Sequence, residues 1–280
     1  MNPSRMNTLS EKKQHLEQYL LSLKSVLVAF SSGVDSTFLL KTAHDLLGDQ
    51  CAAVTARSSI FPSRESEEAA AFCRKEGIRQ ITIDIDELSI DGFSSNPPDR
   101  CYLCKRSIFR QFQETARQEG FSHVVEGSNV DDLGDYRPGL KAIAELQILS
   151  PLREAGLTKS EIRSLSKDLD LPTWNKPSFA CLASRFVYGE EITEQKLSMV
   201  ELAEQRLLDL GFRQFRVRIH GSMARIELEP AEIDRFMQGN IRSEVCAYLH
   251  ELGFLYVTLD LDGYRTGSMN KVLTEKDLKQ

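Results

Sequence analysis

The chain has 280 residues, of which 41% are hydrophobic and 27% charged, the composition of a soluble globular protein with one large domain or two smaller ones. A net charge of −6 and a pI near 5.5 argue against a dedicated nucleic-acid binder. No apolar run reaches the roughly 18 residues of a membrane span, and the polar start MNPSRMNTLSEKK lacks the apolar core of a secretion signal, so we expect a cytoplasmic protein.

The first part of the chain alternates helical and strand patterns. Apolar spacing predicts helices over residues 8–23, 36–48, 63–77 and 105–120, with Ser10 as a possible cap of the first. Gly48 and Gly77 stand where glycine ends a helix. Short apolar runs at residues 25–30, 51–55, 79–85 and 123–127 predict strands between these helices. This alternation is typical of a parallel sheet covered on both faces.

The rhythm changes at about residue 175. Before that point, Thr158 and Glu161 form a capping box for a helix that Pro172 ends. Beyond it, a long helix over residues 193–211 precedes alternating strands at 213–220 and 223–230, then a helix near 243–253 and a strand at 254–261. We therefore predict two domains, an α/β domain over residues 1–174 and a smaller α+β domain with an antiparallel sheet over residues 175–280.

The stretch VAFSSGVDST at residues 28–37 consists of a strand, a turn of small residues and a helix start. Such a turn cradles phosphates, because its N–H groups and the helix N-terminus converge on one anion. It has no lysine and does not fit GxxxxGK[ST]. It resembles the S-G-G-x-D-S loop of the ATP pyrophosphatase superfamily, with Ser32 in place of the first glycine. A plain turn rich in capping serines is the alternative.

That resemblance implies a Rossmann-like fold of the adenine nucleotide alpha hydrolase type. The residues it assigns to ATP are Ser31, Ser32, Gly33, Val34, Asp35 and Ser36. The replacement at Ser32 matters only if this position needs a positive φ, which serine adopts at a cost of about 1–2 kcal/mol. EGSNVDDLGDYRPG at residues 126–139 resembles the second signature of the superfamily and adds Gly127 and Asp132 to the ATP residues. The aspartates of this stretch could otherwise be solvated loop carboxylates.

Three of the six cysteines suggest a shared site. Cys101 and Cys104 form a CxxC motif, and Cys181 lies far downstream. Three thiolates suit a 4Fe–4S cluster with one open iron, which can bind an exogenous ligand such as sulfide. A redox disulfide, a zinc site with a fourth ligand, and unrelated buried thiols are the alternatives. The remaining cysteines are expected to be small core residues: Cys51, Cys73 and Cys246.

Six motifs occur in one order between residues 29 and 270: AFSSGVDST, NPPDRCYLCK, DYRPGLKA, WNKPSFACLASRF.YG, RVRIH...ARIEL and YVTLDLDGYRTGSMN. Together they look like the LarE family, the ATP-dependent sulfur transferases that make the nickel-pincer nucleotide cofactor of lactate racemase. In one type of that family the loop cysteine gives up its own sulfur. In the other type, a CxxC pair and the loop cysteine hold a 4Fe–4S cluster. Because Cys101, Cys104 and Cys181 are all present, the chain resembles the cluster type; a sacrificial Cys181 is the alternative.

The family resemblance also implies a reaction. ATP adenylates the carboxylates of pyridinium-3,5-biscarboxylic acid mononucleotide and releases pyrophosphate, and a sulfur nucleophile then forms each thiocarboxylate. Asp35 and Cys181 are the implied catalytic residues, with Mg²⁺ near Asp35. We expect as partners the nucleotide substrate, sulfide or another sulfur source and the other proteins of nickel-pincer biosynthesis, and we expect a homo-oligomer.

The second domain carries candidate substrate residues. Alternation within FRVRIH puts Arg216 and Arg218 on one face, where two arginines can clamp a phosphate. The alternative is a solvated basic face paired with the next strand. The family resemblance adds Ser184 and Arg185 as phosphate contacts. It also assigns two possible ligands of a divalent metal, Glu204 and Glu227, and Arg235 replaces a third acidic ligand.

Three other functions use parts of the same pattern. A cluster-dependent tRNA thiolase combines the same ATP loop with three cysteines, but the acidic pI argues against RNA. An amidase-type synthetase that uses ammonia would not need the three cysteines. A nonenzymatic iron–sulfur or zinc carrier would explain a degenerate ATP loop.

Overall fold

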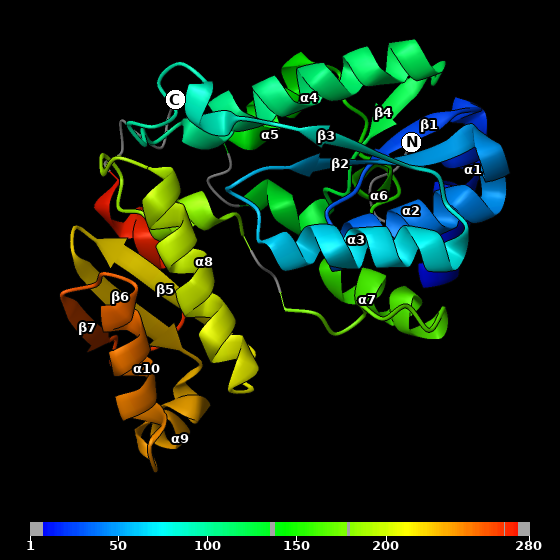
Figure 1. Cartoon of the computed structure of the whole chain (residues 1–280). Helices are drawn as coiled ribbons and strands as arrows, with labels where there is room; N and C mark the ends of the chain where they lie inside the picture. Colours follow the sequence, from blue (N-terminus) through cyan, green and yellow to red (C-terminus); the bar gives the residue numbers. More distant parts are fainter. Residues whose placement is uncertain (1–7, 135–137, 178–179, 266, 274–280) are drawn as a thin grey trace. The chain divides into compact units, whose positions relative to one another are not determined.

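A parallel sheet in the order β3-β2-β1-β4 organises the first part of the chain (Figure 1). The computed structural model describes residues 8–134, 138–177, 180–265 and 267–273. The elements of this part are α1 (Leu9–Leu23), β1 (Val26–Ala29), α2 (Val34–Leu47), β2 (Cys51–Arg57), α3 (Ser63–Glu76), β3 (Gln80–Asp84), α4 (Arg100–Glu119), β4 (His123–Val125), α5 (Gly139–Glu145), α6 (Pro151–Glu154) and α7 (Lys159–Asp168). The predicted α/β class with a parallel sheet is confirmed.

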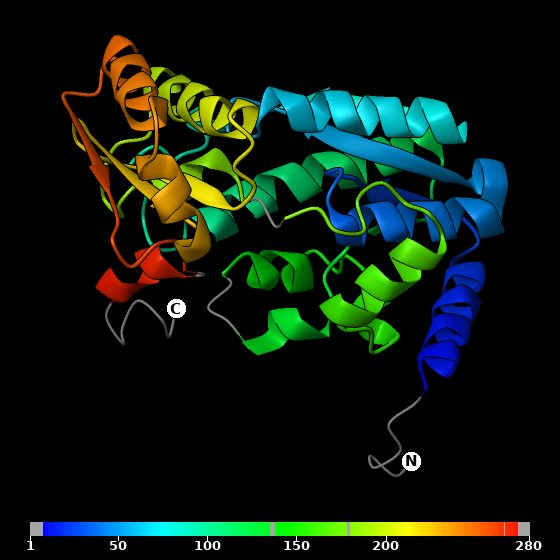
Figure 2. The ribbon, with the colours of Figure 1, turned by 90° about the horizontal axis from the view of Figure 1, so that it is seen from below.

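Both faces of this sheet are covered, as the continuous apolar strands predict. Val26, Leu27 and Val28 of β1 are all fully buried, although successive side chains point to opposite faces. Val26 and Val28 belong to a core cluster with residues of α1, α2 and α3. Figure 1 shows α2 and α3 on one face of the sheet and α4 on the other. α2 also contacts α1 and α7, which lie beside it in Figure 2.

Local signals set most of the helix ends. Gly48 and Gly77 follow α2 and α3 with φ of 53° and 69°, which confirms them as helix ends. The capping box of Thr158 and Glu161 is also confirmed at the start of α7. The cap expected at Ser10 is wrong. Thr8 caps α1, because its side chain accepts from the Glu11 backbone and the Glu11 carboxylate accepts from the backbone of Thr8.

The chain forms two compact units. Of the described residues, 8–57, 63–85 and 101–177 form the first, and 58–62, 86–100, 180–265 and 267–273 form the second. Two segments of the N-terminal half therefore belong to the second unit. Backbone hydrogen bonds hold them there, for example from Leu182 N to Ile60 O at 2.8 Å and from Gly189 N to Asn96 O at 2.9 Å. Independent folding of residues 1–174 and 175–280 stays a prediction.

The second unit is built around a small sheet in the order β5-β6-β7. Its elements are α8 (Glu194–Asp209), β5 (Phe215–His220), β6 (Met223–Leu228), α9 (Ile233–Met237), α10 (Ile241–Glu251) and β7 (Tyr256–Leu259). The β5 and β6 strands are antiparallel, but β7 runs parallel to β6. The prediction of an antiparallel sheet is therefore wrong for β7, because α10 carries the chain back before β7 begins and so gives a crossover.

No helix within the described ranges is long and apolar enough to cross a membrane.

The strand order marks a place where loops meet. From β1 the chain moves to β2 and β3 on one side, whereas β4 pairs with the other side of β1. In open parallel sheets, ligands bind beyond the carboxyl ends of the strands at such a switch point. The segments that follow β1 and β4 are the two that the sequence assigns to ATP.

Candidate functional site

The turn after β1 is closed by hydrogen bonds among its own residues. Ser31 N donates to Ser36 Oγ at 3.3 Å, and Ser36 Oγ lies 3.2 Å from both Ser31 Oγ and Gly33 O. Gly33 stands at the N-cap of α2 with φ of −79° and gives no side-chain cap. The helix thus begins without a side chain over its first N–H groups, which is the arrangement that a phosphate needs.

Ser32 has the backbone conformation that would favour glycine. Its φ is 52°, and its side chain is buried. Ser32 Oγ donates to Glu65 O at 3.2 Å, and Lys176 Nζ donates to Ser32 O at 3.0 Å. The position therefore does require a positive φ, and the serine is held there by contacts on both sides of its backbone.

The segment after β4 approaches the turn closely. A Cβ added to Gly127 would lie 3.1 Å from Ser36 N and 3.3 Å from the carbonyl carbon of Asp35, so glycine allows this approach. Asn129 Nδ2 donates to Asp35 Oδ1 at 3.4 Å, and Asn129 N donates to Asp132 Oδ2 at 2.8 Å. The structure thus brings the predicted ATP residues of both segments together at the switch point. The DYR of DYRPG lies at residues 135–137, outside the described residues.

Two lysines of this site were not predicted from the sequence. Lys159, the first residue of α7, forms an ion pair with Asp35, and its backbone N donates to Asp131 Oδ2 at 2.8 Å. Lys176 contacts Ser32 and forms an ion pair with Glu68. The available signals were position alone: Lys159 directly follows the Thr158 cap, and Lys176 stands in the WNKP motif. They supply the positive charge that the turn itself lacks.

The CxxC cysteines lie in the first turn of α4, which begins at Arg100 rather than at the predicted residue 105. Cys101 is partly exposed and Cys104 is buried. Cys181 belongs to the second unit, where it is partly exposed and directly precedes a short 3₁₀ helix over Leu182–Arg185. In the part of the chain that the structure describes, no group of three or more His, Cys, Asp or Glu side chains is placed to hold a metal ion.

The other cysteines divide by burial. Burial raises the pKa of the Cys51 thiol to about 12 and that of Cys73 to about 11, as expected for core residues. Cys246 is only partly buried, which differs from the core position expected for it.

Arg185 holds the loop of Cys181. Its side chain is fully buried, and its Nε and Nη2 donate to Glu204 at 2.9 and 2.8 Å. Its Nη1 donates to Ala180 O at 2.6 Å and to Cys181 O at 3.0 Å. Burial alone would raise the pKa of Glu204, but the charge and hydrogen bonds of Arg185 lower it. The predicted phosphate contact is thus enclosed and bonded to the protein itself.

Arg216 and Arg218 are also buried, so the alternative of a solvated basic face is wrong. Arg218 donates to Glu227 Oε2 from Nε at 3.1 Å and from Nη2 at 2.9 Å, and to Ser184 O at 3.0 Å. Arg216 lies over the ring of Tyr264 at 5.0 Å. Burial and the charge of Arg185 lower the pKa of Arg216 to about 10. The face is covered because β5 is buried on both sides.

The two predicted metal ligands of this unit are already paired with arginines. Glu204 pairs with Arg185, and Glu227 pairs with Arg218 and Arg225. A divalent ion at either carboxylate would therefore compete with a guanidinium. Arg235, at the position of the third ligand, lies 4.4 Å over the Phe212 ring and donates to Leu210 O.

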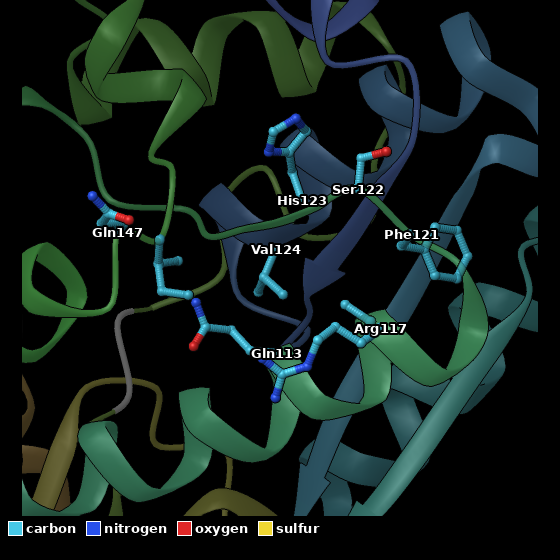
Figure 3. Close-up of a pocket in the computed structure, with 9 residues that line it drawn as sticks. Gln113, Arg117, Phe121, Ser122, His123, Val124 and Gln147 are labelled. Carbon is cyan, nitrogen blue, oxygen red and sulfur yellow. The ribbon is translucent and has the colours of Figure 1, made fainter.

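A small pocket of about 160 Å³ lies elsewhere in the first unit. Gln113 and Arg117 of α4 face it from one side, and His123 and Val124 line it at the start of β4 (Figure 3). Because β4 begins at His123, this pocket is at the amino end of the strand. The Ser31–Ser36 turn lies beyond the carboxyl ends, so the pocket belongs to neither ATP segment.

Comparison with known proteins identifies relatives over nearly the whole chain, although no protein-family model matches it. An uncharacterized protein of Synechocystis sp. is 43% identical over 95% of this chain and 100% of its own. Pyridinium-3,5-bisthiocarboxylic acid mononucleotide synthase of Lactiplantibacillus plantarum is 41% identical over 98% of this chain and 99% of its own. A subunit of the glutamine-hydrolyzing GMP synthase of Methanocaldococcus jannaschii is 25% identical over 68% of this chain and 65% of its own. By its near-full-length similarity to the Lactiplantibacillus synthase, the chain belongs to the LarE family.

Proposed function

We propose that this protein is an ATP-dependent sulfur transferase that converts the carboxylates of pyridinium-3,5-biscarboxylic acid mononucleotide into thiocarboxylates. The observation that carries the proposal is the 41% identity to the Lactiplantibacillus synthase over 98% of the chain. The weaker similarity to a GMP synthase subunit supports an enzyme that uses ATP. The meeting of two ATP segments at the switch point agrees with this function.

Activation by ATP answers a chemical need, because a carboxylate is a poor acyl donor. A carboxylate oxygen of the substrate attacks the α-phosphorus of ATP, and pyrophosphate leaves. The Ser31–Ser36 turn, with Gly127 and Asp132, would bind the nucleotide phosphates. Asp35 is a suitable carboxylate ligand for Mg²⁺, which would neutralise phosphate charge when bound. Its present partner Lys159 would then be available to the phosphates.

Sulfur then replaces AMP at the acyl carbon, and a thiocarboxylate forms. Cys101 and Cys104 fit a shared cluster in that thiolates three residues apart on one helical turn can reach one metal centre. Together with Cys181 they would hold a 4Fe–4S cluster, which supplies a bound sulfide when loaded. The alternative source is Cys181 itself. Its thiolate would attack the acyl adenylate, and cleavage of its Cβ–S bond would leave dehydroalanine.

The buried arginine cluster of the second unit supports an anionic substrate. Three carboxylates, Glu204, Glu227 and Asp260, face four arginines: Arg185, Arg216, Arg218 and Arg225. Their excess positive charge would favour the substrate phosphate, and we propose contacts from Arg216, Arg218 and Ser184. Divalent metal at Glu204 and Glu227 is a further proposal. The homo-oligomer, the cytoplasmic location, the sulfide source and the nickel-pincer biosynthesis partners stay predictions.

The test of the reaction is release of pyrophosphate from Mg-ATP by anaerobically purified protein. We expect release only when the pyridinium substrate is added, with thiocarboxylate formation seen by mass spectrometry. ATP turnover with tRNA instead would favour a thiolase, and cluster binding without any ATP turnover would favour a carrier.

The test of the sulfur source is the iron, acid-labile sulfide and zinc content of the same protein. About four irons and four sulfides per chain are expected. They should be lost in Cys181→Ala and kept in Cys246→Ala, the matched control. A metal-free protein whose mass falls by one sulfur after turnover would establish the sacrificial route, and stoichiometric zinc would indicate a structural site.

A further inference from the structure

One lysine joins three parts of the first unit at the candidate ATP turn. Lys176 Nζ donates to Ser32 O at 3.0 Å and to Ser32 Oγ at 3.3 Å, and it forms an ion pair with Glu68 of α3. The Lys176 side chain is 17% exposed, whereas that of Glu68 is 49% exposed. A single ammonium group thus connects α3, the turn and the segment that follows α7.

The Glu68 contact is the weak arm of this arrangement. An ion pair with an exposed carboxylate is stabilised little, because water screens the charges and two flexible side chains must be ordered. Phosphate oxygens are strong, charge-assisted acceptors. A triphosphate bound at the turn would lie beside an ammonium group that already bonds to the backbone of the turn. The phosphates and Glu68 would then compete for the same donor.

We propose that Lys176 is a phosphate-responsive positioning residue. Without nucleotide, its ammonium is shared between Ser32 and Glu68; with ATP bound, it leaves Glu68 for the phosphates. In the empty turn it also supports the Ser32 backbone, whose φ of 52° serine adopts at a cost. The inference rests on the proposed use of ATP and adds to it an exchange that opposes binding until Glu68 is displaced.

The first experiment measures Mg-ATP affinity by isothermal titration calorimetry on the full chain. Glu68→Gln removes the competitor, and we expect ATP to bind about two- to fivefold more tightly, the factor expected for loss of an exposed ion pair. Glu67→Gln is the matched control, because it removes the same charge from the neighbouring residue of α3 and should leave the affinity unchanged.

A merely structural ion pair would behave differently. Glu68→Gln should lower the urea midpoint slightly without ATP while it tightens ATP binding, and these opposite signs are the signature of the exchange. Lys176→Gln should weaken ATP binding, and Lys176→Arg should restore most of it. In the Lys176→Gln background, Glu68→Gln should give no further gain.

Two results would overturn the proposal: equal ATP affinity of the Glu68→Gln and Glu67→Gln proteins, or a Glu68→Gln gain that persists without Lys176. If Lys176→Gln does not fold, the comparison of the two glutamate variants still decides. A wild-type protein that binds no ATP would overturn the proposed function itself.

Discussion

At the scale of single residues, Ser32 and Arg185 show what the sequence could and could not tell. The SSGVDS pattern located the turn and identified Ser32 as the departure from the family loop. Its φ could not be read from the letters, because serine occurs in turns of either sign of φ. Arg185 was predicted at a surface because it follows the cysteine motif. Its burial depends on Glu204 of α8, a long-range contact that no local pattern encodes.

The φ of Ser32 predicts an unusual order of stabilities. Ser32→Gly and Ser32→Ala both remove the Oγ contacts, but only alanine keeps the strain at φ of 52°. We expect the glycine variant to be more stable than the alanine variant by about 1 kcal/mol, although alanine usually stabilises a chain relative to glycine. Urea unfolding of the two proteins measures the difference. An alanine variant of equal or greater stability would show that the turn relaxes.

At the scale of elements, repeating strands and helices could be predicted because each carries its own period and its own end signals. The strand order and the direction of β7 could not, because they depend on how separate elements pair. The start of α4 at Arg100 was missed for a related reason: Pro97 and Pro98 stand just before the CxxC motif and suggested a loop. The two cysteines are therefore placed by a helix, at fixed spacing along one turn.

The N-terminus of α7 links helix stability to the ATP site. Thr158 caps α7, and the next residue, Lys159, pairs with Asp35. Thr8 forms the same capping box in α1 without a hydrogen bond to the turn. We expect Thr158→Ala and Thr8→Ala each to lower the free energy of unfolding by about 1 kcal/mol. Only Thr158→Ala should also weaken Mg-ATP binding in calorimetry, by several-fold. Equal loss of ATP affinity in both proteins would mean that the helix start does not position Lys159.

At the scale of the whole molecule, two buried glutamates of the second unit should give stability opposite dependences on pH. Pairing with Arg185 lowers the pKa of Glu204 despite its burial, so its contribution is present above the usual value of 4.5 and is lost as the pH falls. Burial raises the pKa of Glu87, which a hydrogen bond with Ser58 only partly offsets. The contribution of Glu87 is therefore present at low pH and is lost as the pH rises through the raised pKa.

Two conservative variants separate these contributions. Glu204→Gln should cost about 3–5 kcal/mol at pH 7, because it leaves Arg185 buried and unpaired, and less at pH 4. Glu87→Gln should instead be more stable than the wild type at pH 7 and lose that advantage by pH 4. Urea unfolding at both pH values gives the four differences. A Glu87→Gln protein that is less stable than the wild type at pH 7 would contradict the assignment of a charged, poorly solvated carboxylate.

The segments at residues 58–62 and 86–100 have a consequence for how this protein can be divided. The chain passes between its two units five times, so no single break in the polypeptide separates them. A fragment that begins at residue 175 would lack Ile60 O, the acceptor for Leu182 N, and Asn96 Nδ2, the donor to Val187 O at 2.6 Å. It would also lack the buried Phe93 side chain. Exchange of halves between relatives by simple gene fusion would therefore transplant an incomplete core, and a working chimera has to carry these two short segments from the same parent as its C-terminal half.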